Sequence, residues 1–135
     1  MSGHHHYCQI SAGDQSKNSY SFVCEGVETA LSVHQAFPDS HLIASLGKNN
    51  YPRLEPGVLG ERVVLVLDND SVPLTRDKLL QTTVERLVRC GKLVYYVLPP
   101  HLDNRVKTDM NDILIHHGVD SVLQTIINNM KKVRM

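Results

Sequence analysis

Short apolar runs alternate with amphipathic stretches along the chain from residue 19 onward. β-Branched and aromatic residues predict strands over residues 19–24, 41–46 and 93–98. Residues 62–67, Arg-Val-Val-Leu-Val-Leu, are apolar without interruption after the arginine. An unbroken run of this kind is typical of a strand buried on both faces, and it therefore predicts a parallel sheet.

The segments between these runs have the periodicity of helices. A helix is predicted over 27–37, where Pro38 ends it, and a second helix follows Pro73 and ends at Gly91. A short helix is predicted from Thr108 or Asp109 to the region of Gly118, and a last helix, with one apolar stripe, follows it.

Strands that alternate with helices predict an α/β domain of three layers, with a mostly parallel sheet of about four strands flanked by helices. Residues 48–60, which contain two prolines and two glycines, are predicted to form a loop. Residues 1–18 are polar and aperiodic and are expected to be a flexible lead, so that 19–135 form one domain.

Composition restricts the classes of protein to consider. A chain of 135 residues that is 41% hydrophobic has the size of one domain and too much apolar content for a disordered protein. No apolar run approaches the roughly 18 residues of a membrane span, and no leader is visible. Three widely spaced cysteines argue against a disulfide framework and favour a reducing, cytoplasmic setting. The 14 basic and 14 acidic residues balance, which excludes nucleic-acid binding by bulk charge alone.

Acidic residues follow three of the predicted elements. Glu25 comes directly after the first strand, and Asp68 and Asp70 come after the third. The fourth strand leads to a segment that contains Asp109 and Asp112. Because ligands bind at the carboxyl ends of the strands in open parallel sheets, we expect these carboxylates to meet at one edge.

Asp68 and Asp70 are two residues apart, so in extended backbone they project to the same side. Two neighbouring carboxylates repel each other, and a hard divalent cation removes that conflict. The pair therefore predicts a site for Mg²⁺ or Mn²⁺. The alternative is a local turn, in which Asp and Asn bond to their own backbone.

The other candidates each allow two interpretations. Glu25 is a general acid or base, or a metal ligand, or else a carboxylate favoured by the start of a helix. Asp109 is an N-cap, or it joins Asp112 on one helical face and approaches the metal. Lys107 and Arg105 are candidate phosphate contacts, although a loop arginine is usually only solvated.

Four motifs resemble those of Toprim domains. Residues 23–31, Val-Cys-Glu-Gly-Val-Glu-Thr-Ala-Leu, resemble the glutamate motif, and 64–70, Val-Leu-Val-Leu-Asp-Asn-Asp, resemble the Asp-x-Asp motif. Residues 44–47 are similar to the strand between them, and 107–114, Lys-Thr-Asp-Met-Asn-Asp-Ile-Leu, are similar to the ending of primase-type members. The resemblance covers roughly residues 20–118 and is strongest to phage and plasmid primases and to mobilisation or relaxase-linked proteins.

This resemblance implies phosphoryl or nucleotidyl transfer on a nucleic acid, most simply DNA. It implies that Glu25 is the acid–base residue, that Asp68 and Asp70 hold Mg²⁺, and that Asp109 and Asp112 are auxiliary. Primases of the family carry further domains, so the chain is expected to belong to a larger replication or mobilisation protein, to bind nucleic acid weakly, and not to make primers alone. Many members have a glycine shortly after Asp-x-Asp, where this chain has Ser71-Val72-Pro73.

Two other classes remain open. In a haloacid-dehalogenase-like phosphatase Asp68 would be a covalent nucleophile and Asp70 the general acid, with Lys107 and Asp112 in later motifs; Glu25 would then have no role. In a non-catalytic remnant the acidic edge would bind a metal or nucleic acid without turnover. A separate zinc site formed by His4, His6 and Cys8 is a further alternative.

Overall fold

The computed structural model describes residues 7–11, 20–68, 77–100 and 109–133. The strands are β1 (Cys8–Ser11), β2 (Tyr20–Cys24), β3 (His41–Ala44), β4 (Arg62–Val66), β5 (Leu93–Val97) and β6 (Lys131–Lys132). The helices are α1 (Val27–Ala36), α2 (Lys78–Arg89), α3 (Met110–His117) and α4 (Val119–Asn129), with two 3₁₀ helices, η1 (Lys48–Arg53) and η2 (Pro56–Val58).

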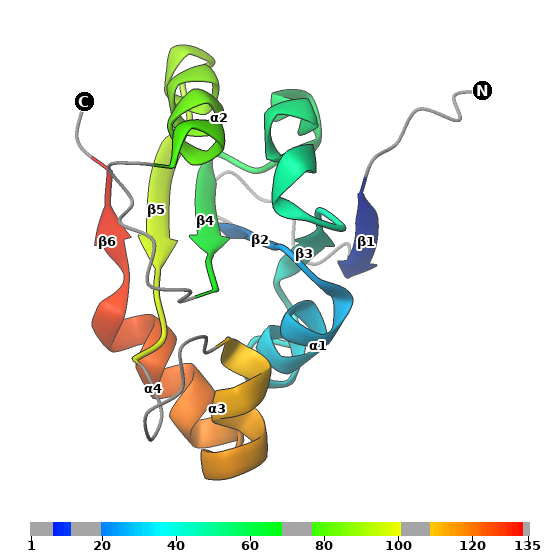
Figure 1. The fold of residues 1–135 in the computed structure, drawn as a ribbon, viewed down its shortest axis with the longest axis vertical. Coiled ribbons are helices and arrows are strands. Elements are labelled where there is room, and N and C mark those ends of the chain that lie inside the picture. The colour runs from blue at the N-terminus through cyan, green and yellow to red at the C-terminus, as the bar shows by residue number, and fades with distance from the viewer. Residues whose placement is uncertain (1–6, 12–19, 69–76, 101–108, 134–135) are drawn as a thin grey trace.

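The strands form one mixed sheet in the order β1-β3-β2-β4-β5-β6 (Figure 1). Its centre, β3-β2-β4-β5, is parallel throughout and consists of the four strands predicted from the sequence. β1 pairs antiparallel with β3, and β6 pairs antiparallel with β5. The expectation of about four mostly parallel strands is therefore corrected to six strands in a mixed sheet.

The two added strands lie at the edges. β1 falls within the segment 1–18 that was expected to be a flexible lead, and β6 follows the last helix. Neither carries an alternating apolar pattern, since the residues of β6 and the first two of β1 are exposed. Pairing with the backbone of a neighbouring strand holds such segments in the sheet, and this pairing leaves little trace in the side chains.

Helices cover both faces of the sheet, as the three-layer prediction requires. α1, α3 and α4 pack against one another on one face, and α2 packs with η1 on the other (Figure 1). Alternate strand residues supply the two cores: Phe22 and Cys24 face α1, whereas Val23 faces α2 and η1. In β4, Val64 and Val66 alternate with Val63 and Leu65 in the same way.

The chain leaves the centre of the sheet in two directions. After β2 it passes through α1 to β3, whereas β4 lies on the other side of β2 and continues through α2 to β5. The carboxyl ends of β2 and β4 therefore lie at the point where the strand order reverses, which is where open α/β sheets bind ligands. No helix within the described ranges is long and apolar enough to cross a membrane.

Candidate functional site at the carboxyl ends of β2 and β4

Glu25 directly follows β2, and the turn after β3 holds its backbone in place. The Ser45 N–H donates to the Cys24 carbonyl at 2.8 Å, and the Gly47 N–H donates to the Glu25 carbonyl at 2.9 Å. Asn50 in turn donates through Nδ2 to the Ser45 carbonyl at 2.9 Å. The Glu25 side chain is only partly buried, so its carboxylate is available to a ligand.

This turn ends β3 at Ala44, two residues earlier than predicted. Leu46 has a φ of 64° and Gly47 has a φ of 121°, values that take the backbone out of the strand conformation. A positive φ is uncommon for a residue with a side chain, and the value at Gly47 is restricted almost entirely to glycine. The backbone beside Glu25 is therefore shaped by a conformation that few sequences adopt.

Asp68 lies at the end of the neighbouring strand. Cys24 pairs in register with Val66, and the Leu67 N–H extends β4 by donating to the Val97 carbonyl at 2.9 Å. Asp68 comes next, partly exposed as a residue but with its Oδ1 atom buried. Glu25 and Asp68 therefore follow neighbouring parallel strands at the same edge of the sheet, which we call the acidic edge.

Asp109 comes to this edge from the far end of the chain. It is the N-cap of α3: its Oδ1 accepts from the Asp112 N–H at 2.9 Å, and Asp112 Oδ2 accepts from the Asp109 N–H at 3.0 Å. Ser32 Oγ also donates to Asn111 Oδ1 at 3.1 Å, which ties the start of α3 to α1. The hydrogen bonds thus confirm that Asp109 is an N-cap. They do not test whether Asp109 and Asp112 also approach a metal.

Electrostatics place Asp109 near Asp68. Burial raises the pKa of the Asp109 carboxyl, and the negative charges of Asp112 and Asp68 raise it further, against a backbone hydrogen bond that lowers it. Burial, assisted by the charge of Asp68, also raises the pKa of the Cys24 thiol, which is therefore neutral. The acidic edge thus gathers negative charge that a cation would offset.

Not all candidate residues can be placed. Asp70, Lys107 and Arg105 lie outside the described residues. Glu28 is exposed in the first turn of α1, in keeping with a carboxylate that favours a helix start.

The residues that can be placed fit a magnesium ion in the kind of donor they offer. Within the described ranges no group of three His, Cys, Asp or Glu side chains is arranged to hold a metal. Mg²⁺ needs less than that, because it often takes one or two carboxylates and keeps several waters. The carboxylate oxygens of Glu25 and Asp68, at an edge of negative potential, are ligands of the type that it prefers.

One residue of this site was missed from the sequence. Tyr51 of η1 is fully buried, and burial raises the pKa of its phenol well above the usual value. The negative charges of Glu25, Asp68 and Asp77 raise it further, so the side chain lies within the influence of the acidic edge. A signal does exist, since Tyr51 is a lone large aromatic residue within the polar stretch 48–60 that the sequence predicts to be a loop.

Comparisons with known proteins agree with this architecture. A family model described as Toprim domain matches residues 20–120. The zinc-binding and RNA polymerase domains of the Aquifex aeolicus primase are similar in structure, with a TM-score of 0.58 and 18% identity over 85% of this chain. A DNA primase domain from Pseudomonas aeruginosa has a TM-score of 0.52 and 16% identity over 86% of this chain.

The chain is much shorter than those primase structures. It covers 27% of the Aquifex chain and 35% of the Pseudomonas chain. At such identities the two structures establish a shared fold. Comparison with curated proteins gave no match.

Proposed function

Because the chain belongs to the Toprim domain family, we propose that it is the magnesium-dependent catalytic domain of a primase- or mobilisation-type protein that acts on nucleic acid. The proposal includes weak binding of the nucleic-acid backbone and cooperation with other domains. A net charge of zero leaves little general attraction for phosphates, so affinity would depend on the site itself.

One observation carries this proposal. Glu25 and Asp68 follow adjacent parallel strands, β2 and β4, that are paired in register at the point where the strand order reverses. A carboxylate proposed for proton transfer and a carboxylate proposed for a cation thus follow neighbouring strands at the edge where this class of sheet binds ligands.

Each residue has a defined part in the proposed chemistry. Glu25 would exchange a proton with the attacking or leaving oxygen and would join Asp68 and Asp70 as a ligand of Mg²⁺ or Mn²⁺. The bound cation would neutralise charge that develops on the phosphoryl oxygens. Asp109 and Asp112 would support the site from the start of α3, and Lys107 and Arg105 would contact phosphates.

The phosphatase alternative has less support. It gives no role to Glu25, yet the loop of β3 holds the backbone of this residue through the Gly47 N–H. The family match also includes both Glu25 and Asp68 in one continuous range.

Metal binding at Asp68 is the first test. We expect Mg²⁺ or Mn²⁺ to perturb the amide signals of Glu25 and Asp68 together in a two-dimensional NMR titration of the wild-type chain. Asp68→Asn should weaken this binding by about tenfold or more, because it removes a charged ligand at nearly constant volume. Asp39→Asn is the matched control, since Asp39 is an exposed carboxylate in the turn after α1, before β3 begins.

The outcome against the proposal is equally definite. If Asp68→Asn and Asp39→Asn bind Mg²⁺ with the same affinity, or if the wild type does not respond at millimolar Mg²⁺, the acidic edge is not a metal site of this chain. Where binding is seen, anisotropy of a labelled single-stranded oligonucleotide should rise with Mg²⁺ in the wild type and not in Asp68→Asn.

A further inference from the structure

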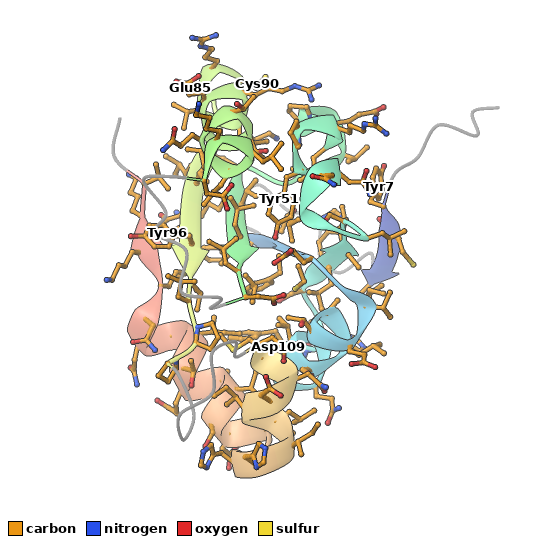
Figure 2. All side chains as sticks on the ribbon, in the orientation of Figure 1. Tyr7, Tyr51, Glu85, Cys90, Tyr96 and Asp109 are labelled. Atoms are coloured by element: carbon orange, nitrogen blue, oxygen red, sulfur yellow. The ribbon has the colours of Figure 1, made fainter. Side chains whose placement is uncertain are left out.

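The hydroxyl of Tyr51 lies buried near the acidic edge of the sheet. Tyr51 of η1 has no exposed surface, and its ring packs in the core between the sheet and α2 (Figure 2). Its hydroxyl has no hydrogen-bond partner among the described residues. Buried hydroxyls nearly always have a partner, so this one calls for an explanation.

Packing explains the ring but not the hydroxyl. A phenylalanine would fill the same space beside Leu54 and Leu59 without burying a polar atom. An unsatisfied hydroxyl in a core destabilises the fold, because it has lost its hydrogen bond to water and gained none in return. Tyrosine at this position is therefore unfavourable for folding alone.

The carboxylate of Glu25 is the candidate acceptor that strand alternation places on the same face of the sheet as Tyr51. Strand alternation sends Glu25 to the same face of the sheet as Val23, and Val23 shares a core with Tyr51. Among the charged groups that act on the phenol, Glu25 has the largest effect. An ionised carboxylate only accepts hydrogen bonds, so toward Glu25 the Tyr51 O–H would be the donor.

We propose that Tyr51 is a positioning residue of this site, and that its hydroxyl donates a hydrogen bond to the Glu25 carboxylate once a metal ion is bound at the acidic edge. The inference rests on the proposed function. If one oxygen of Glu25 held a cation, the other would remain to accept a hydrogen bond from the Tyr51 O–H. Such outer partners fix the orientation of metal-site carboxylates. Tyr51 would contact neither the metal nor the substrate.

Tyr51→Phe separates this role from a structural one. We expect the substitution to weaken Mg²⁺ binding about tenfold, the loss typical of removing an outer partner of a metal site. The thermal unfolding midpoint of the metal-free protein should stay the same or rise, because the substitution removes a hydroxyl without a partner. Tyr96→Phe is the matched control: Tyr96 is half-buried on β5, packs against the same core, and should change neither quantity.

A direct readout is available from the ring itself. In a chain labelled with ¹³Cζ-tyrosine, the Tyr51 signal can be assigned by its loss in Tyr51→Phe. We expect it to shift when Mg²⁺ alone is added, as the hydroxyl gains an acceptor, while the Tyr96 signal stays in place.

The results distinguish the inference from the function on which it rests. Unchanged Mg²⁺ affinity in Tyr51→Phe, or a Tyr51 signal that does not respond to Mg²⁺, overturns the positioning role while Asp68→Asn still reports on the metal site. A lower unfolding midpoint in metal-free Tyr51→Phe also overturns it, because the hydroxyl is then bonded in the free fold. A wild type that binds no Mg²⁺ refutes the proposed function first.

Discussion

Asp109 combines two tasks that make opposite demands on its charge. As an N-cap it accepts the Asp112 N–H, which stabilises the start of α3 (Figure 2). As a charge it lies near Asp112 and Asp68, and the burial and repulsion raise its pKa. The cap needs an acceptor oxygen on Asp109. Without a cation, burial and the neighbouring negative charges favour the neutral form of the same carboxyl.

Two substitutions at Asp109 separate these tasks. Asp109→Ala removes the acceptor and should lower the free energy of unfolding by about 1 kcal/mol. Asp109→Asn keeps an acceptor and removes the charge, so the free energy of unfolding at pH 7 should stay the same or rise. Urea denaturation of both variants measures the difference.

Asp120 provides the control for this pair. It is exposed in the first turn of α4, and Asp120→Ala should change the free energy of unfolding by about 0.5 kcal/mol or less. Equal losses in Asp109→Asn and Asp109→Ala would contradict the interpretation, because they would show that the charge itself stabilises the fold.

At the scale of elements, the turn between β3 and η1 holds the backbone at the end of β2, where the acidic edge begins. Its hydrogen bonds run from Gly47 to Glu25 and from Asn50 back to Ser45. Gly47 has nothing within 4 Å of where a Cβ would stand, so only its φ of 121° demands glycine. The geometry of the turn therefore depends on backbone conformation and not on space.

Gly47→Ala tests this dependence. Forcing a side chain into this backbone region should cost about 1–3 kcal/mol of unfolding free energy, measured by chemical denaturation. It should also weaken Mg²⁺ binding, since the turn positions Glu25.

Gly91 supplies a matched comparison for Gly47. It has a φ of 84° and open space at its Cβ position, but it lies between α2 and the start of β5, away from the carboxyl ends of the strands. Gly91→Ala should therefore destabilise the fold and leave Mg²⁺ affinity unchanged. If both variants lose Mg²⁺ affinity equally, the loss reflects general instability and not the turn.

At the scale of the whole molecule, a buried polar chain ties together the opposite end of the sheet. The Gly60 N–H donates to Ser21 Oγ at 2.7 Å, and Ser21 Oγ lies 2.8 Å from His41 Nδ1. His41 Nε2 lies 3.1 Å from Gln9 Oε1. A neutral imidazole with its proton on Nε2 satisfies all of these contacts, and it links β1, β2, β3 and the segment before β4.

This arrangement predicts a loss of stability in mild acid. Burial lowers the pKa of His41 from its usual 6.5, so below that pH the unfolded chain takes up a proton that the folded one resists. The free energy of unfolding should therefore fall as pH drops below 6.5, by at most about 1.4 kcal/mol per pH unit for this group.

Denaturation curves recorded between about pH 7.5 and about pH 5, compared with those of His41→Gln, measure this slope. His41→Gln should reduce the slope, because it removes the group that titrates. His117→Gln, at an exposed residue of α3, should keep the slope of the wild type. A slope that survives His41→Gln would assign the effect to other groups.

The sequence predicts the centre of this fold better than its borders. Buried parallel strands such as β4 must be apolar on both faces, so their runs are conspicuous. That Glu25 and Asp68 follow neighbouring strands is a consequence of strand order alone. β1 and β6 depend on backbone pairing, and the position of Tyr51 depends on the packing of η1 against α2; neither is encoded in a local pattern.

The two edge strands have a consequence for how the molecule behaves among its own copies. β1 is interrupted by a register shift between Gln9 and Ser11, and β6 is only two residues long, both of them exposed lysines. Short, irregular or charged edges are poor templates for the addition of a further strand. They shield apolar inner strands such as Leu93–Val97, whose free edge would otherwise invite aggregation.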